Sequence, residues 1–165
     1  GVSGDVQVGL RDRPSTEEIG AFARQWDPQF FHVDEVRAAN EGYFGGLIAS
    51  GVQTLAVYQR LSVDRLLRHW DVIGGAGIRD LRFLRPVRPG DTLTGFTVIE
   101  DVQGQPARGR MRVVSTGGLI NQNRKPVLAL MMSSYLRTAS YTQLTMATIL
   151  RDVISTSSLA LYLTQ

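Results

Sequence analysis

The stretch VQTLAVYQRLSVDRLLRH, Val52–His69, decides the fold that this sequence predicts. Its apolar residues recur at the three- and four-residue spacing of a helix and extend around most of the helix surface. A helix that is apolar on most of its sides is buried on most of its sides. We therefore predict one long helix at the centre of the domain. The stripe that the spacing indicates consists of Val52, Leu55, Ala56, Gln59, Val63, Leu66 and Leu67.

Three or four β-like segments follow this helix, separated by short turns. Glycines at 74–77 mark either a break or a glycine-rich entry into the first of them. Consecutive strands joined by short turns pair antiparallel. The sequence thus predicts the α+β class, with a curled antiparallel sheet wrapped on one long helix. The predicted strands are Ile78–Leu84, Thr92–Asp101, Gly109–Thr116 and Val127–Leu136, with a turn at 103–106.

On the other side of the central helix, the chain begins with a possible edge strand at Val6–Leu10 and then a helix. Ser15 is the expected N-cap of that helix, and Glu18 stands three residues later as its capping-box partner. Pro28 ends the helix, because the residue before a proline disfavours the helical region. Asp27 is therefore expected at the point where the chain leaves the helix.

Two histidines are present, and His32 is the candidate for chemistry. A lone histidine is more often structural than catalytic, but Asp27 lies five residues earlier and could orient the imidazole. A histidine that titrates near neutrality beside a carboxylate can polarise a water molecule. Asp34 is better explained as the N-cap of a short helix at 34–39. We interpret His69 as structural, near a helix C-terminus.

The run Ala49-Ser50-Gly51 precedes the long helix. The first backbone N–H groups of a helix have no partner within it and lie at the positive end of its dipole. They could hold an enolate or oxyanion. The simpler interpretation is that small residues let a buried helix begin close to the sheet.

Composition narrows the possible functions. Hydrophobic residues make up 43% and charged residues 20% of the 165 residues, as expected for one ordinary domain. With no cysteine, disulfides and thiolate chemistry are excluded. The net charge of +3 comes from scattered arginines, which favours a small-molecule partner over nucleic acid. No apolar run is long enough to span a membrane, and no secretory signal is apparent, so we expect a cytoplasmic protein.

Three motifs carry a resemblance to a known family. They are DPQFFHVD at 27–34, YFGGLIASG at 43–51 and IRDLRFLRPVRPGDTL at 78–93. In this order they resemble the MaoC-like dehydratases, or (R)-specific enoyl-CoA hydratases, of the hot-dog fold. The resemblance covers Ser15–Arg137 and implies a single domain over 1–137, with a tail at 138–165 outside the pattern. It further implies dimers and syn addition of water to an enoyl thioester, such as trans-2-enoyl-CoA, without a metal or redox cofactor.

The resemblance also implies roles for individual residues. Asp27 and His32 match the catalytic acid-base pair, and Gly51 matches the glycine whose N–H binds the thioester oxygen. The hydratase motif reads D-x-N-P-x-H, whereas this chain has Gln29 and Phe30 at the asparagine and proline positions. Ser50 stands where many relatives have histidine. Ser50 and Gln29 are therefore the further candidates for substrate binding.

Three functions remain open at this point. The leading prediction is a hydratase or dehydratase acting on an acyl-CoA or a similar thioester. A hot-dog thioesterase, in which water attacks the thioester carbonyl, is the second. A non-catalytic binder of acyl thioesters is the third, favoured by the altered motif at Gln29 and Phe30.

Overall fold

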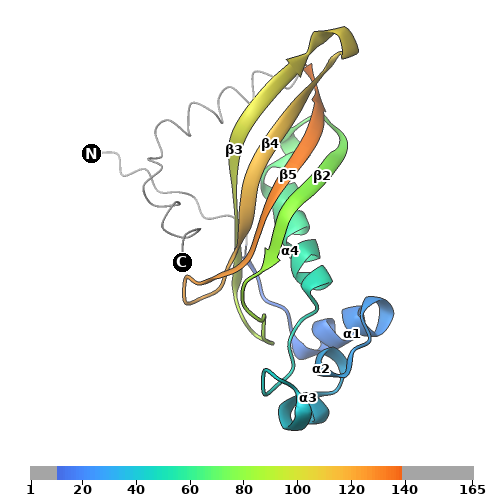
Figure 1. Cartoon of the computed structure of the whole chain (residues 1–165), viewed down its shortest axis with the longest axis vertical. Helices are drawn as coiled ribbons and strands as arrows, with labels where there is room; N and C mark the ends of the chain where they lie inside the picture. Colours follow the sequence, from blue (N-terminus) through green and yellow to red (C-terminus); the bar gives the residue numbers. More distant parts are fainter. Residues whose placement is uncertain (1–10, 139–165) are drawn as a thin grey trace, which may run out of the picture.

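The computed structural model describes residues 11–138. The edge strand expected at Val6–Leu10 and the tail beyond residue 138 lie outside the described residues. Figure 1 shows a curved sheet with a long helix against it and shorter helices gathered at one end. The elements are β1 (Arg11–Asp12), α1 (Thr16–Trp26), α2 (Phe30–Val33), α3 (Glu35–Glu41), α4 (Gly51–Arg65), the 3₁₀ helix η1 (Leu67–His69), β2 (Val72–Phe83), β3 (Leu93–Gln105), the 3₁₀ helix η2 (Pro106–Arg108), β4 (Arg110–Ile120) and β5 (Pro126–Arg137).

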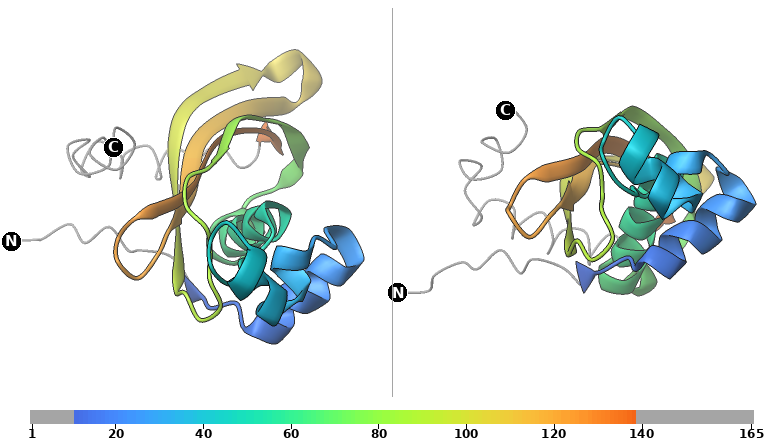
Figure 2. Two further views of the ribbon diagram at one scale, coloured as in Figure 1. Left: turned by 60° about the horizontal axis from the view of Figure 1, so that its bottom comes forward. Right: turned by 90° about the horizontal axis from the view of Figure 1, so that it is seen from below.

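The five strands form one antiparallel sheet in the order β1-β3-β4-β5-β2. The end-on views of Figure 2 show the sheet curling so that α4 lies in its concave side. The predicted α+β architecture, a curled antiparallel sheet on one long helix, is confirmed. Within the described residues, no helix is both long and apolar enough to cross a membrane.

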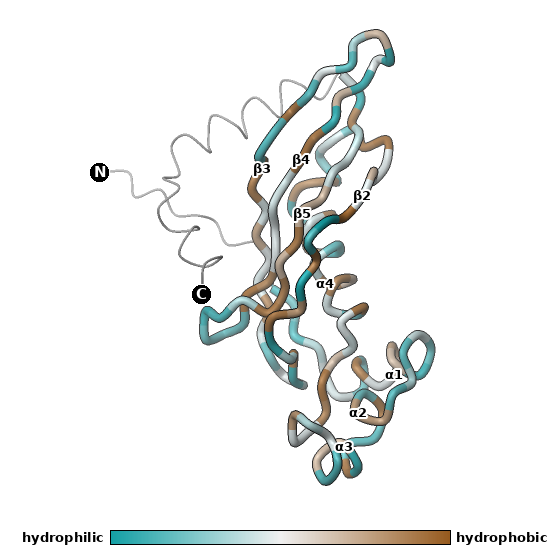
Figure 3. Tube along the Cα trace, in the orientation of Figure 1, coloured by the Kyte–Doolittle hydropathy of each residue, from teal (hydrophilic) through white to brown (hydrophobic). Residues whose placement is uncertain are grey.

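The buried face of α4 differs from the predicted stripe. Val57, Tyr58 and Leu61 are buried against the sheet, whereas Val52 and Val63 are 55% and 40% exposed. Side chains on β3, β4 and β5 complete the core, and Figure 3 shows hydrophobic residues along these strands and before α4. The prediction failed because α4 is apolar on more than one side, so its spacing alone did not say which side meets the sheet. Helix α4 is also shorter than predicted. It ends at Arg65, and Leu67–His69 form the separate 3₁₀ helix η1.

The strands are longer than predicted. Strand β2 begins at Val72, so the glycines at 74–77 lie inside a strand, as one of the two interpretations held. Its pairing with β5 shifts register at three places, and Asp80 takes a left-handed φ of 51° beside one of them. Edge strands tolerate such bulges. Strand β3 runs through the turn expected at 103–106, and the chain reverses over η2 and Gly109 instead.

Helix α1 positions the first candidate residue. Ser15 and Glu18 form the predicted capping box, and Asp27 is the C-cap of the helix, with its N–H bonded to the carbonyl of Ala23. Asp34 caps α3 by accepting a hydrogen bond from the N–H of Arg37, as predicted. Residues 30–33 form a helix that was not predicted, α2, a single turn that carries His32.

Candidate active site

Asp27 and His32 lie next to each other. Oδ2 of Asp27 is 3.3 Å from Nε2 of His32. His32 stands five positions after Asp27, and the Pro28 turn followed by the single turn of α2 brings their side chains together. The carboxylate is 23% exposed and the imidazole only 5%, so the pair has one open side.

His32 is fixed by the extended segment before α4. Its Nδ1–H donates a hydrogen bond of 2.7 Å to the carbonyl of Ile48, and the N–H of Ile48 donates to the carbonyl of Phe31 at 3.1 Å. Because a carbonyl can only accept, Nδ1 carries the proton. Nε2 faces Oδ2 of Asp27, so it donates to the carboxylate when the ring carries both protons, and in the neutral ring it can accept from a water molecule. The ring of Phe31 packs edge-on against the imidazole at 4.5 Å and limits its rotation.

Asp27 accepts two further hydrogen bonds. The hydroxyl of Ser50 donates to Oδ2 at 2.7 Å, and the amide of Gln29 donates to Oδ1 at 2.8 Å. These donors favour the charged form of the carboxyl group. They lower the pKa of Asp27 below its ordinary value, with Ser50 as the largest cause and Gln29 the next; partial burial opposes them, and the charge of His32 adds to them. Asp27 is thus held as a carboxylate.

Ser50 and Gly51 begin helix α4. Ser50 is fully buried and is the N-cap, because its Oγ accepts a hydrogen bond from the N–H of Val52 at 3.2 Å. Gly51 is the first residue of the helix. Its N–H belongs to the group that a helix leaves without an internal partner, at the positive end of the dipole. The helix start predicted at the Ala49-Ser50-Gly51 run is therefore confirmed.

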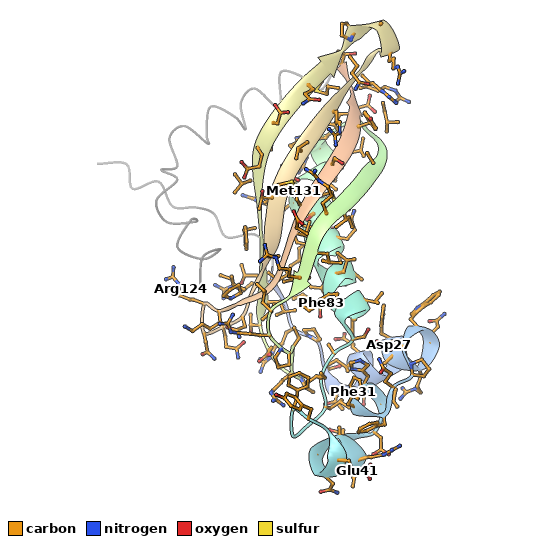
Figure 4. All side chains as sticks on the ribbon, viewed as in Figure 1. Asp27, Phe31, Glu41, Phe83, Arg124 and Met131 are labelled. Carbon is orange, nitrogen blue, oxygen red and sulfur yellow. The ribbon has the colours of Figure 1, made fainter. Side chains whose placement is uncertain are left out.

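These groups share one pocket. Its volume is about 380 Å³, within the range of small-molecule sites. Figure 4 shows Asp27 on the side of the short helices and Phe83 on the side of the sheet. The lining residues are Asp27, Gln29, His32, Phe44, Ile48, Ala49, Ser50, Gly51, Val52, Thr54, Phe83, Leu84, Arg85, Pro86, Val87 and Val127.

The structure brings together all five candidate site residues: Asp27, Gln29, His32, Ser50 and Gly51. Asp34 and His69 do not line the pocket, in agreement with their structural interpretations. Sequence reasoning missed the carbonyl of Ile48, which carries no side-chain signal. It also missed Phe83, whose place in a strand pattern gave no reason to expect it beside the helix start. Within residues 11–138, no three His, Asp or Glu side chains gather in a way that could hold a metal ion.

The arrangement suits a reaction of water with a carbonyl compound. A carboxylate and an imidazole can hold a water molecule between them and move its proton. The N-terminus of a helix can stabilise negative charge that develops on a carbonyl oxygen. The pocket's apolar residues, such as Val52 and Leu84, offer room for an acyl group.

Comparisons with known proteins match most of the chain to one family. The family described as MaoC like domain matches residues 4–121. YdeM, an uncharacterized protein of Bacillus subtilis strain 168, is 39% identical over 113 residues, which are 68% of this chain and 77% of YdeM. A crystal structure of a MaoC-like dehydratase from Rhodospirillum rubrum is 34% identical, with a TM-score of 0.69, and the match covers 81% of this chain and 94% of the other.

A less similar solved structure supports the fold alone. The (R)-hydratase from A. caviae, involved in PHA biosynthesis, is 20% identical with a TM-score of 0.64, and the match covers 80% of this chain and 98% of the hydratase. The hot-dog fold that the sequence motifs implied is confirmed by these structures.

Proposed function

The chain belongs to the MaoC-like domain family, and from that premise we propose that it is a hydro-lyase acting on enoyl thioesters. It adds water to the double bond of a substrate such as a trans-2-enoyl-CoA, or removes water from the 3-hydroxy product. The observation that carries the proposal is the Asp27–His32 pair, 3.3 Å apart, in one pocket with the first residue of α4.

Gly51 binds the thioester carbonyl in this proposal. Its N–H donates to the carbonyl oxygen, which takes up negative charge as the enolate forms. Helix α4 adds the positive end of its dipole at the same place. An adjacent enoyl group would then lie in the pocket that Asp27 and His32 share.

Asp27 and His32 hold the water. Nε2 of His32 takes a proton from the water molecule while its oxygen bonds to the β-carbon of the enoyl group. The α-carbon of the enolate then takes a proton from the imidazolium, so one water molecule is added and no other reactant is needed. Asp27, kept ionised by Ser50 and Gln29, orients the water and stabilises the imidazolium. The reverse steps remove water.

A hydration assay with crotonyl-CoA tests the proposal. The purified protein is expected to consume the enoyl thioester absorbance without releasing a free thiol. Thiol release would instead support the thioesterase. Tight binding without any turnover, unchanged in Asp27→Asn, would support a non-catalytic binder of acyl thioesters. If the protein consumes no member of a panel of enoyl thioesters, the hydratase proposal is overturned.

We also propose a homodimer formed along the β2 edge of the sheet, where β2 has no neighbouring strand on one side within residues 11–138. Strand β2 ends the sheet, and an exposed edge invites pairing with another chain. Apolar residues in and directly after β2, and two residues of the predicted stripe of α4, are exposed in the single chain. They are Val52, Val63, Val72, Ile73, Ile78, Leu81, Phe83 and Leu84.

Light scattering at micromolar concentration measures this association. The protein is expected to be a dimer, and Ile78→Lys, which places a charge on the β2 edge, is expected to shift it towards the monomer. Val36→Lys is the matched control, because Val36 is exposed on α3, away from β2. A monomeric parent protein would contradict the proposal.

A further inference from the structure

The ring of Phe83 lies against the first residue of α4. A Cβ atom added to Gly51 would lie 2.7 Å from Cζ of Phe83 and 2.9 Å from each of its two Cε atoms. The tip of the ring therefore occupies the space that any side chain at position 51 would need. Glycine is required at this position by the Phe83 ring, and it is also the first residue of the helix.

Phe83 holds this place although it is poorly covered. It is the last residue of β2, opposite Leu128 of β5, and it is 55% exposed. Part of the ring belongs to the exposed β2 patch proposed above to form the dimer, and its tip lies against the helix start. The ring lines the same pocket as Asp27 and His32. Phe83 comes from the sheet, whereas Asp27 and His32 come from the short helices.

We infer that Phe83 determines which acyl groups the site accepts, an inference that rests on the proposed hydratase function. When the thioester oxygen accepts a hydrogen bond from the Gly51 N–H, the carbonyl carbon lies beside Gly51. The α-carbon of the acyl group is bonded directly to that carbonyl carbon. The α-carbon is then confined between the Phe83 ring and the Asp27–His32 pair. A substituent on it competes with the ring for the space beside Gly51, so the site favours acyl groups without a branch at this carbon.

A comparison of two substrates tests the selectivity. The parent protein is expected to favour crotonyl-CoA over 2-methylcrotonyl-CoA in kcat/KM by about tenfold or more, since one methyl group is worth that much in a hydrophobic pocket. Phe83→Ala is expected to reduce this preference by about tenfold, and Phe83→Leu by less. Phe96→Ala is the matched control, because the Phe96 ring also packs on a glycine, Gly118, but lines no part of the pocket.

A second test couples the two positions. Gly51→Ala keeps the N–H but pushes the ring aside, so it should lower kcat/KM for crotonyl-CoA by about tenfold when Phe83 is present. The same change in Phe83→Ala should cost less than about threefold, because the methyl group then enters vacated space. Equal losses in both backgrounds would show that the ring does not act on position 51.

A spectroscopic readout separates the inference from the proposed function. The amide signal of Gly51 in a ¹⁵N–¹H spectrum should move in Phe83→Ala, where the ring current is removed, and stay in place in Phe96→Ala. If the parent protein turns over neither substrate, the hydratase proposal fails while this shift still reports the contact. If the parent hydrates crotonyl-CoA and Phe83→Ala leaves the substrate preference unchanged, the inference about Phe83 is wrong.

Discussion

The hydroxyl of Ser50 donates a hydrogen bond of 2.7 Å to Oδ2 of Asp27. This bond joins the N-cap of α4 to the C-cap of α1. The Ser50 hydroxyl also accepts a hydrogen bond from the N–H of Val52. A single buried hydroxyl therefore both caps the central helix and fixes the carboxylate of Asp27. A hydroxyl can do both because it donates one hydrogen bond and accepts others.

Ser50→Ala should therefore affect activity and stability together. Loss of the strongest donor raises the pKa of Asp27, so the acidic limb of the pH–rate profile should move to higher pH. A hydrogen bond to a charged group contributes about 1.5–3 kcal/mol, which corresponds to a loss of roughly 10- to 100-fold in kcat/KM. The lost N-cap should cost about 1 kcal/mol of unfolding free energy.

Ser62→Ala is the control for this experiment. Its hydroxyl donates to the carbonyl of Tyr58 in the same helix and lies outside the pocket. It should leave the pH–rate profile in place. An unshifted acidic limb in Ser50→Ala would mean that the 2.7 Å bond does not control the ionisation of Asp27.

Asp27→Asn and His32→Ala should each reduce turnover of crotonyl-CoA by roughly a hundredfold or more. Groups that move or orient a proton in the transition state typically contribute this much. The two losses should be far from additive, because in the proposed reaction the residues act on the same water molecule. Steady-state kinetics of both single variants and the double variant measure this. Near-parental activity in both single variants would remove the acid-base assignment.

Asp27 should also make the fold sensitive to acid. Its pKa in the folded protein lies below the ordinary value of 3.8, so the unfolded chain takes up the proton first as the pH falls. The stabilisation is therefore complete above 3.8 and is lost as the pH falls from there through the folded pKa. Urea unfolding at pH 6, 4 and 3 should show a steeper loss of stability in the parent than in Asp27→Asn, with Ser50→Ala between them. Parallel curves would contradict the lowered pKa.

Gln29→Ala should have a smaller effect in the same direction as Ser50→Ala. Gln29 is the second cause of the lowered pKa of Asp27, and its amide donates to Oδ1 at 2.8 Å. The acidic limb of the pH–rate profile should move upward, but less far. Gln103→Ala is a close control, since its amide donates to Asp101 at the same two-residue spacing, 2.7 Å away and outside the pocket. A larger shift in Gln29→Ala than in Ser50→Ala would reverse the ranking of the two donors.

Local signals in the sequence predicted both ends of α1 and the start of α3, but not the end of α4. The capping box of Ser15 and Glu18, the stop at Pro28 and the cap at Asp34 depend on neighbours within four residues, and all three are present. The buried side of α4 was not predictable in the same way. Because Val52 and Val63 are as apolar as Val57 and Leu61, only the position of the sheet selects the buried side.

The candidate site shows the same division. Asp27 and His32 lie within one short stretch, and Ser50 and Gly51 stand at a recognisable helix start, so sequence reasoning reached all of them. The resemblance to the MaoC-like family added Gln29 as a further candidate. The contacts of Ile48 and Phe83 could not be predicted from the sequence. One is a backbone carbonyl and the other depends on where an edge strand ends, and both are set by the packing of segments that are distant in sequence.

The candidate site residues come from two groups of elements that share one core. Asp27, Gln29 and His32 come from the group of short helices at one end, whereas Ser50, Gly51 and Phe83 belong to α4 and the sheet (Figure 1). Regions of a protein can open separately at a lower free energy than global unfolding requires. Detachment of the short helices would dismantle the site while the sheet stays folded. Heat inactivation of this protein should accordingly set in below its melting temperature, which makes activity the more sensitive gauge of damage.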